Sequence, residues 1–421
     1  MKPAFGRRAM LLSALAGPWP VIAAASSPTA PAQASSAPLP DPVRPGRPMV
    51  FPRDHGAHPG SRIEWWYVTG WLLPQSLSAG AASGSAAQAM GPSAGTGAED
   101  DARRLGFQVT FFRSATGKGD GLLSRFAPRQ LLFAHAALSD LAARRHDHAQ
   151  RLARWSGQAD AALRDRAMLN DADVAVGGWQ LLRTPGPGNP GALGMPGSQA
   201  QSLDSRWLTR VDTPDFTLDM SMAPTQPALL QGEQGWSRKG PQPSQASHYV
   251  SLPQLQVSGR LTRRGATQAL TGRAWFDHEW SDELLHPQAV GWDWIGMNLH
   301  DGSALTAFVL RRADGSALWA GGSLRSAAGA LRVFGADEVR WQPGRTWRSP
   351  VTGASYPVQW SVQTPSGRFT VQALADAQEL DNRSSIGTAY WEGLSALLDA
   401  QDRRVGLGYL EMTGYAGRLV I

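Results

Sequence analysis

The ten residues GRAWFDHEWS, at positions 272–281, alternate in a way that predicts a β-strand with two different faces. Since successive side chains of a strand point to opposite sides, Trp275, Asp277 and Glu279 share one face. The opposite face carries the side chains that alternate with these: Phe276, His278 and Trp280. A pair of carboxyl groups beside an indole ring therefore points one way, and a histidine between two aromatic rings points the other way.

The same period of two recurs along the chain and predicts an all-β protein. Within residues 104–113, one face carries Leu105, Phe107, Val109 and Phe111. Asp301-Gly302 and Asp314-Gly315 lie between apolar runs, a strong signal for hairpin turns. The strands fall into two sets that separate near residue 245. We therefore expect two tandem antiparallel β-barrels or sandwiches, an N-terminal domain over 51–244 and a C-terminal domain over 245–421.

Three segments depart from this pattern. Residues 146–170 are rich in Ala, Leu and Arg and contain no Pro, which predicts one or two short inserted helices. Residues 74–101 and 184–202 are dominated by small residues, Gly and Pro, so neither can bury a core. We expect both of these low-complexity segments to be mobile surface loops.

The N-terminus has the features of an export signal. Arg7-Arg8 precedes apolar stretches at residues 9–16 and 21–25, and small-x-small cleavage sites precede Ser26 and Ser35. Residues 1–34 are thus expected to be a signal peptide, of the twin-arginine type or of the general secretory type. The mature protein is then periplasmic or secreted. Residues 35–50, rich in Ser, Ala and Pro, are expected to form a disordered linker.

The composition excludes several classes of protein. Of the 421 residues 42% are hydrophobic and 18% charged, which suits a folded chain with a core. No apolar run after residue 25 is long enough for a membrane span. The absence of cysteine excludes disulfides and thiolate metal sites. The formal charge of +6 falls to +3 without the three basic residues of the first 34, too weak to indicate nucleic-acid binding.

Aromatic residues and polar groups concentrate in a few further segments. Tryptophan outnumbers tyrosine 17 to 6, which indicates a stiff interior or a cavity for an apolar ligand. The segments, in order, are EWWYVTGW at 64–71, the strand at 272–281, GWDWIG at 291–296, YWEG at 390–393 and GYLEMTGY at 408–415. Glu64 and Trp66 share a face against Trp65 and Tyr67, and Trp292 and Trp294 share a face against Asp293.

These segments, found in this order, resemble the AttH-type lipocalin-like family, which includes the carotenoid 1,2-hydratases. The resemblance covers nearly all of residues 51–421. It implies two lipocalin-like barrels packed together and no cofactor. Members of the family include exported proteins linked to ABC transporters of the lipoprotein type, hydratases that act on apolar alkenes and fungal relatives that act on polyketides.

The hydratase branch carries its proton-donating Asp in a Tyr-x-Asp motif, which aligns here with Trp275-Phe276-Asp277. Trp replaces the Tyr, so a hydroxyl group that orients water is lost. Hydration of an alkene needs a carboxylic acid that stays protonated near neutral pH, and burial or a second carboxylate supplies that condition. Asp277 is the predicted donor, Glu279 tunes it, and His278 is the third catalytic candidate. Predicted ligand contacts are Glu64, Trp65, Trp66, Tyr67, Tyr249, Trp275, Trp280, Trp292 and Trp294.

The sequence leaves two functions open. One is a binding or carrier protein that holds an apolar or amphipathic small molecule and works beside membrane transporter components. The export signal and the missing Tyr favour this function. The other is a cofactor-free hydratase or isomerase of an isoprenoid alkene. In either case the polar residues of 272–281 can instead form a satisfied network that fixes the interface between the barrels.

Other site chemistries are disfavoured. Asp54, His55 and His58 precede the first strand and could approach His278, but no ligand spacing such as HExxH is present, so we expect no metal. Neither a Gly-x-Ser-x-Gly nucleophile motif nor a phosphate-binding loop occurs, which argues against a hydrolase or a nucleotide-binding enzyme.

Overall fold

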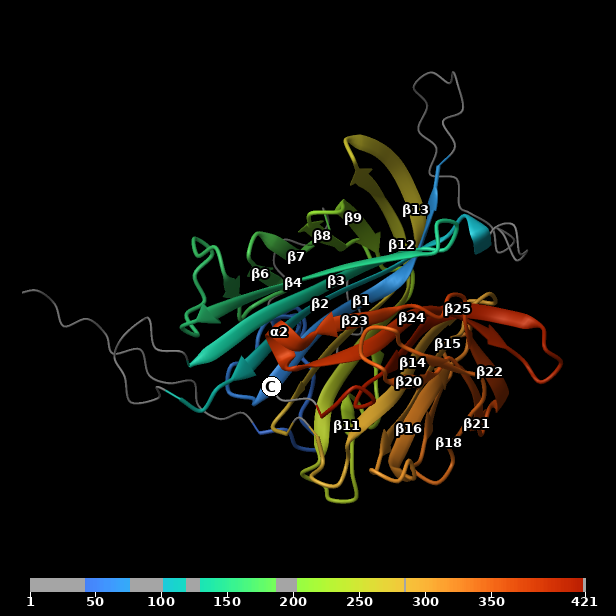
Figure 1. Ribbon diagram of the computed structural model, residues 1–421. Helices are drawn as coiled ribbons and strands as arrows, with labels where there is room; N and C mark the ends of the chain where they lie inside the picture. Colours follow the sequence, from blue (N-terminus) through green and yellow to red (C-terminus); the bar gives the residue numbers. More distant parts are fainter. Residues whose placement is uncertain (1–41, 76–100, 119–128, 187–202, 284, 419–421) are drawn as a thin grey trace, which may run out of the picture. The chain divides into compact units, whose positions relative to one another are not determined.

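The computed structural model describes residues 42–75, 101–118, 129–186, 203–283 and 285–418. Within these ranges the chain forms almost entirely antiparallel β-structure, which confirms the predicted all-β class (Figure 1). The expected signal peptide at 1–34 and most of both low-complexity segments, at 76–100 and 187–202, lie outside the described residues. None of the described helices is long and apolar enough to cross a membrane.

The first sheet has 13 strands among the described residues, in the order β4-β3-β2-β1-β13-β12-β9-β8-β7-β6-β5, with β10 and β11 paired to β12. Because β6 contacts β2, β3 and β4, the sheet curls back on itself around one hydrophobic core. Its strands are β1 (Ile63–Pro74), β2 (Leu105–Ala115), β3 (Gln130–Asp140), β4 (Arg145–Trp155), β5 (Arg166–Ala167), β6 (Asp173–Val176), β7 (Trp179–Thr184), β8 (Arg206–Asp212), β9 (Thr217–Ala223), β10 (Leu229–Leu230), β11 (Trp236–Arg238), β12 (Ala246–Arg263) and β13 (Ala266–Ser281).

The second sheet has ten strands among the described residues, in the order β17-β16-β15-β14-β25-β24-β22-β21-β18, with β23 paired to β24. It encloses its own core. Its strands are β14 (Gly291–Leu299), β15 (Ala304–Arg311), β16 (Ala317–Arg325), β17 (Leu331–Phe334), β18 (Arg340–Pro343), β21 (Gln359–Thr364), β22 (Gly367–Ala373), β23 (Glu379–Asn382), β24 (Thr388–Leu398) and β25 (Arg404–Met412). Smaller elements are the pair β19 (Thr346–Arg348) and β20 (Ser355–Pro357), the 3₁₀ turn η1 (Arg53–His55) and the helix α2 (Arg383–Ile386).

The two sheets meet through their central strands. β1 contacts β25, β2 contacts β24, and both β12 and β13 contact β14. A third hydrophobic cluster lies at this junction and combines Tyr67 and Trp275 of the first sheet with Trp294, Phe308 and Tyr409 of the second. The aromatic segments of the sequence are therefore gathered where the sheets face each other, which is the arrangement expected for two packed lipocalin-like barrels.

We expected the two sets of strands to separate near residue 245, but the first sheet continues beyond that residue. The hairpin β12–β13 belongs to the first sheet, and the second sheet begins at Gly291. β13 pairs with β1 over its whole length, from Ile63↔Ser281 to Pro74↔Leu270, while β12 pairs with β9. Alternation reveals a strand but not its neighbour, so the sequence could not show that this late hairpin lies between β1 and β9.

The predicted helices within 146–170 are wrong. Residues 145–155 form β4, which pairs with β3 from Gln130↔Trp155 to Asp140↔Arg145, and the rest of the segment consists of turns and the short strand β5. Helix propensity is a weak preference that tertiary context overrides. Here β3 supplies backbone hydrogen-bond partners along the whole of β4. These bonds outweigh the helix preference of the Ala, Leu and Arg residues.

The predicted disordered linker is wrong for the part that the structure describes, residues 42–50. Val43 and Met49 are buried, and the Val43 N–H donates to Asp282 Oδ2 over 2.9 Å. Arg47 forms a two-pronged contact with Asp54, with Nη1 and Nη2 each 3.1 Å from a carboxylate oxygen. Two apolar anchors and one buried ion pair hold this segment, although its composition resembles that of a tether.

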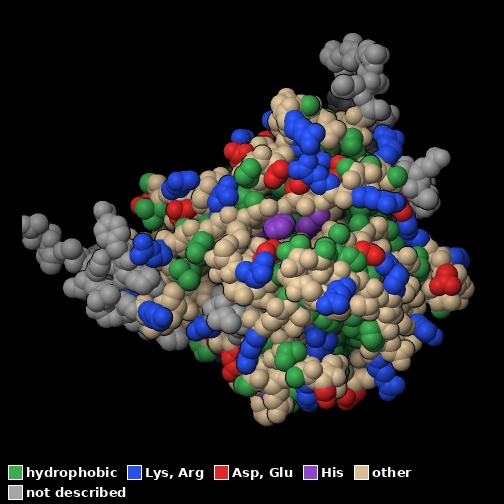
Figure 2. Space-filling view, in the orientation of Figure 1, with side chains coloured by type: hydrophobic (Ala, Val, Ile, Leu, Met, Phe, Trp, Pro, Cys, Tyr) green, Lys and Arg blue, Asp and Glu red, His purple; other side chains and the backbone are tan. Residues whose placement is uncertain are grey.

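Charged side chains of both signs are interspersed over the face seen in Figure 2. Such mixing agrees with the weak net charge left after removal of the first 34 residues.

Candidate functional site

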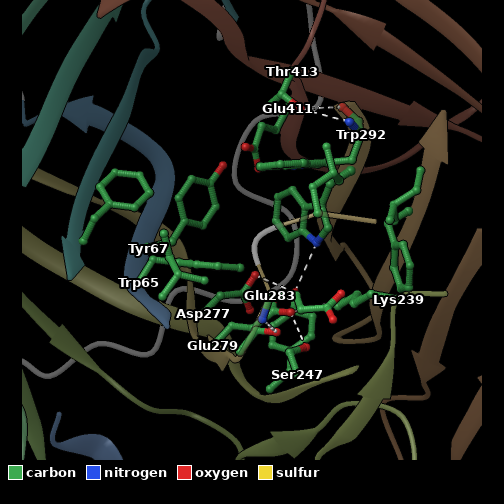
Figure 3. A pocket seen from close by; sticks show the side chains of 18 of the residues that line it. Trp65, Tyr67, Lys239, Ser247, Asp277, Glu279, Glu283, Trp292, Glu411 and Thr413 are labelled. Atoms are coloured by element: carbon green, nitrogen blue, oxygen red, sulfur yellow. Dashed lines mark hydrogen bonds and ion pairs between the residues drawn. The ribbon is translucent and has the colours of Figure 1, made fainter. Parts of the chain in front are cut away.

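A cavity lies at the junction of the two sheets (Figure 3). Strands β1, β2, β3, β12 and β13 of the first sheet and β14, β15, β24 and β25 of the second contribute to its wall. Many of the apolar lining residues are aromatic, among them Trp65, Tyr67, Trp292, Trp294 and Phe308. About 120 Å³ of free space remains, several times the roughly 30 Å³ that one water molecule occupies in the liquid. Side chains therefore do not fill the junction.

The faces inferred from alternation are those observed. Asp277 and Glu279 of β13 line the cavity, as do Trp65, Tyr67, Trp292 and Trp294. Asp293 lies on the other side of β14, where it binds Arg311 over 2.7 Å. Gly296 allows Trp294 to lie along its own strand, because a Cβ at this glycine would come within 2.3 Å of the indole ring.

Asp277 is held by three uncharged hydrogen-bond donors. Tyr249 donates its hydroxyl to Oδ2 over 2.7 Å, Ser251 donates to Oδ1 over 2.5 Å, and the Trp275 indole N–H donates to Oδ1 over 2.7 Å. Ser251 is the cross-strand partner of Asp277, which explains how β12 brings both of its donors to this carboxyl group. The Trp294 indole N–H in turn donates to the Tyr249 hydroxyl over 3.1 Å.

Burial raises the pKa of Asp277 to about 7, because its side chain is cut off from water and only 2% of the residue is exposed. The hydrogen bonds from Ser251, Tyr249 and Trp275 oppose this shift, and the nearby negative charge of Glu279 adds to it. A carboxyl group with such a pKa exists in both protonation states near neutral pH. It can therefore give up a proton and take one back.

Glu279, two residues along, has a different environment. It accepts a hydrogen bond from Ser247 and forms an ion pair with Lys239 Nζ over 2.9 Å. The Lys239 ammonium group also lies over the rings of Phe308 and Tyr249, 4.3 Å and 4.7 Å from their centres. Lys239 therefore forms its ion pair with Glu279, and none of the ion pairs among the described residues includes Asp277.

The opposite wall carries a second pair of carboxyl groups, which the sequence analysis did not assign. Glu392 of β24 and Glu411 of β25 are cross-strand partners, and both line the cavity. Figure 3 shows Glu411 across the cavity from Asp277. Burial raises the pKa of both groups, that of Glu411 to about 8, and the charge of Glu411 raises that of Glu392 further.

The remaining face of β1 and β13 is occupied by a charged network. Glu64 Oε1 is hydrogen-bonded to His58 Nδ1 over 2.7 Å and to His278 Nε2 over 2.9 Å, and Glu64 Oε2 accepts from Arg113 Nε over 2.8 Å. Glu64, His278 and Arg113 are fully buried. Although burial alone would raise it, the pKa of Glu64 is held well below its usual range by His58, Arg113 and His278.

Four residues predicted to act at the site belong to this network instead of the cavity. His278, the third catalytic candidate, and Glu64 are core members of the network. Trp66 stacks on His278 with ring centres 4.8 Å apart, and Trp280 stacks on His58 at 3.6 Å. Because side chains of a strand alternate, none of these four side chains can share a face with Asp277. Their position agrees with the alternative raised in the sequence analysis, in which these residues form a satisfied network of hydrogen bonds and ion pairs.

Ligand-type atoms of His58, Glu64 and His278 lie within 4.8 Å of one another. Each of these groups already takes part in the hydrogen bonds of the network, and the Arg113 guanidinium occupies the second oxygen of Glu64. The cluster is thus accounted for as a buried ion-pair network, and its geometry gives no indication of its own for a metal.

Comparison with known proteins shows which family has this architecture. The family model described as AttH-like matches residues 94–415. A crystal structure of a protein assigned as AttH from Nitrosomonas europaea has 42% sequence identity and a TM-score of 0.72, over 89% of this chain and 99% of that chain. The chain belongs to the AttH-like family.

A more distant likeness concerns the fold alone. Kievitone hydratase from Nectria haematococca superposes with a TM-score of 0.57 at 14% identity, over 89% of this chain and 97% of that chain. The search of curated proteins gave no significant match.

The structure places a tyrosine hydroxyl close to Asp277, although this AttH-like sequence lacks the Tyr of the hydratase motif. Trp275 stands where the motif has Tyr, but Tyr249 of the neighbouring strand places its hydroxyl 2.7 Å from Asp277. Trp275 itself keeps a role as a hydrogen-bond donor to Asp277, although its side chain is not part of the cavity wall. Tyr249 lines the cavity, and its predicted contact with a ligand stays a prediction.

Several cavity residues of the AttH-like chain escaped prediction. Glu392 and Glu411 lie in the YWEG and GYLEMTGY segments, which were recognised as dense in aromatic and polar groups without roles being given to their acids. Their position as cross-strand partners is the signal that sequence alone could not supply. Lys239 and Ser247 precede or begin β12 and carry no motif.

Proposed function

We propose that this AttH-like protein is a cofactor-free acid catalyst that adds water to a carbon–carbon double bond, or moves that bond, in an apolar or amphipathic small molecule. Asp277 is the proton donor. The observation that carries the proposal is a buried carboxyl group, held only by uncharged donors, that faces an aromatic cavity with its pKa raised to about 7.

The step is balanced without a cofactor. The proton of Asp277 forms a new C–H bond with one alkene carbon, using the π electrons, and the other carbon becomes cationic. In hydration, water adds its oxygen to that carbon, and the extra proton of the added water returns to the Asp277 carboxylate. In isomerisation, the neighbouring carbon loses a proton to Asp277 instead. Aromatic faces such as Trp65 and Trp294 stabilise the cation by up to about 2 kcal/mol when water is excluded.

Tyr249, Ser251 and Trp275 have positioning roles. They orient the carboxyl group, and Tyr249 also links it to the Trp294 indole N–H. Glu279 acts at a distance, since its charge favours the protonated form of Asp277. The hydroxyl of Tyr249 supports an enzyme over a carrier, because the missing hydroxyl was the argument from sequence against hydration.

The test uses geraniol as an acyclic isoprenoid alkene, in D₂O, with mass spectrometry of the recovered alkene and of any hydrated product. The wild-type protein is expected to introduce deuterium at carbon, and Asp277→Asn is expected to slow this by about 10²- to 10⁴-fold, the usual contribution of a general acid. Asp171→Asn is the matched control, because the pKa of Asp171 is also raised by burial while its ion pair with Arg183 lies outside the cavity wall.

Two outcomes contradict the proposal. If Asp277→Asn exchanges deuterium at the wild-type rate, Asp277 is not the donor. If the wild-type protein binds the alkene, seen as quenching of tryptophan fluorescence, but introduces no deuterium, the cavity serves binding and carriage only.

A further inference from the structure

We propose that Glu392 and Glu411 form a cation-binding subsite, so that the cavity takes an apolar molecule carrying a protonated amine or a quaternary ammonium group. The inference deepens the proposed function in that it names a chemical class of ligand for the same cavity. It concerns binding and not turnover, so the two can fail separately.

The first argument is an unsatisfied acceptor. Glu392 is buried, it lines the cavity, and its Oε2 atom has no hydrogen-bond partner among the described residues. A buried polar atom without a partner is costly, and such atoms in native structures call for an explanation. Glu411, its cross-strand partner, is half-buried and keeps part of its surface accessible. A cationic group at this wall would satisfy both acids.

The second argument is the balance of charge around the cavity. Five carboxyl groups line it: Asp277, Glu279, Glu283, Glu392 and Glu411. The basic side chains among the lining residues are Lys239 and His286. Lys239 is paired with Glu279, and no ion pair formed by the described residues joins Glu392 or Glu411 to a cationic side chain. The wall opposite Asp277 is therefore negative when ionised and has no counter-ion of its own.

The third argument is the aromatic wall. Trp65, Tyr67, Trp292, Trp294 and Phe308 line the same space as the acids. Aromatic faces attract cations, and cages of such rings bind quaternary ammonium groups in other proteins. An apolar body with a cationic head matches both parts of the wall, whereas an anionic ligand would meet the carboxylates and a purely apolar one would leave Glu392 unpartnered.

The protonation of the pair is consistent with this geometry. Without a ligand, burial favours the neutral acids: it raises the pKa of Glu411 to about 8 and that of Glu392 well above its ordinary value, and the charge of Glu411 adds to the shift at Glu392. A bound cation favours the ionised acids, so binding releases protons and strengthens as pH rises. Other titratable groups that act on the pair are Asp277, Glu279, Asp293, Tyr67, Tyr390 and Tyr409.

The test compares two probes of the same size and shape, benzyltrimethylammonium and its uncharged carbon isostere neopentylbenzene, on the whole protein. Binding is followed by quenching of tryptophan fluorescence at low salt. We expect the cation to bind at least about tenfold more tightly at pH 8.5, and its affinity to rise about threefold or more from pH 6.5 to 8.5. The preference should fall to about twofold or less in Glu392→Gln/Glu411→Gln.

The matched control is Glu233→Gln/Glu338→Gln, which removes two exposed carboxylates that are not part of the cavity wall and should keep the preference. Asp277→Asn should also keep it while losing deuterium exchange, which separates this inference from the proposed function. Equal affinities of the wild-type protein for the two probes would overturn the inference without any variant. If the double variant does not fold, Glu411→Gln alone must reduce the preference, and an unchanged preference there also overturns it.

Discussion

Asp277 and Glu64 are buried carboxyl groups on neighbouring strands, and they behave in opposite ways. Asp277 is 2% exposed and Glu64 is not exposed at all. Yet the pKa of Asp277 is raised to about 7, while that of Glu64 is held well below its usual range. Burial pushes both values upward, so the difference comes from the partners. Asp277 has uncharged donors, whereas Glu64 has Arg113 and two histidines.

The two faces of this sheet therefore hold carboxyl groups with different properties. The face with cationic partners fixes a permanent negative charge and ties the segment around His58 to β1, β2 and β13. On the cavity face, the uncharged donors around Asp277 leave that carboxyl group free to change its protonation near neutral pH. Depth of burial therefore does not decide whether a carboxyl group can change its protonation near neutral pH, and the charge of its neighbours does.

The comparison predicts its largest effect on stability at Glu64. Glu64→Gln leaves the fully buried Arg113 guanidinium without a counter-charge, and removal of one member of a buried ion pair costs about 3–5 kcal/mol. The free energy of unfolding from urea denaturation at pH 7 measures this loss. Asp219→Asn is the control, because the Asp219–Arg210 pair is well exposed and should cost less than about 1 kcal/mol. Equal losses in the two variants would mean that the network around Glu64 is not structural.

The second prediction concerns the pH dependence of stability, which should have opposite signs for the two acids. For Asp277 the folded protein holds its proton more tightly than the unfolded chain, from the ordinary value of 3.8 up to about 7. Between pH 3.8 and about pH 7, the free energy of unfolding of the wild-type protein should therefore fall relative to that of Asp277→Asn as pH rises. The fall is about 1.4 kcal/mol per pH unit at most. Above pH 7 the difference should be constant.

For Glu64 the folded protein releases its proton more readily, so its stabilising effect is complete above the ordinary value of 4.5 and is lost as pH falls below it. The advantage of the wild-type protein over Glu64→Gln should therefore shrink in acid. Urea denaturation of the three proteins from pH 3 to 8 checks both slopes. Slopes of the same sign would refute the contrast drawn between the two faces.

The smallest predicted effect is at Tyr249. Its hydroxyl donates to Asp277 Oδ2 and favours the ionised form, so Tyr249→Phe should raise the pKa of Asp277 by about one unit further. The carbonyl stretch of the protonated acid, followed by infrared spectroscopy against pH and assigned with Asp277→Asn, measures the midpoint. Ser247→Ala, which removes a donor to Glu279 only, should move the midpoint much less. A midpoint that falls in Tyr249→Phe would contradict the assigned hydrogen bond.

The sequence was sufficient to predict the all-β fold class, the family and the side of each strand on which a given side chain lies. Alternation correctly separated Asp277 and Glu279 from His278 and Trp280, because the period of a strand is a local property. The motifs correctly indicated the AttH-like family. The same alternation also placed Trp65 and Tyr67 apart from Glu64, as observed.

What could not be predicted depends on contacts between distant segments. Nothing local shows that Glu392 and Asp277 line the same cavity, or that Glu64 binds Arg113, which is 49 positions away. Residues 146–155 have the composition of a helix and become a strand because β3 lies beside them. The place of His278 in the network with Glu64 could not be predicted for the same reason, since a face can be recognised in the sequence but its neighbours cannot.

The position of the hairpin β12–β13 has a consequence for how the chain is made. On one side, β1 pairs with β13 and β9 pairs with β12, so both strands take a neighbour from residues 246–281. The chain leaves β1 at Pro74 and β9 at Ala223, well before that hairpin. Until that hairpin has been synthesised, both strands present open edges, the kind of surface that pairs with other chains. The nascent first sheet is thus a high-contact-order structure whose completion must wait for its last two strands, and truncation at residue 245 would leave it permanently unfinished.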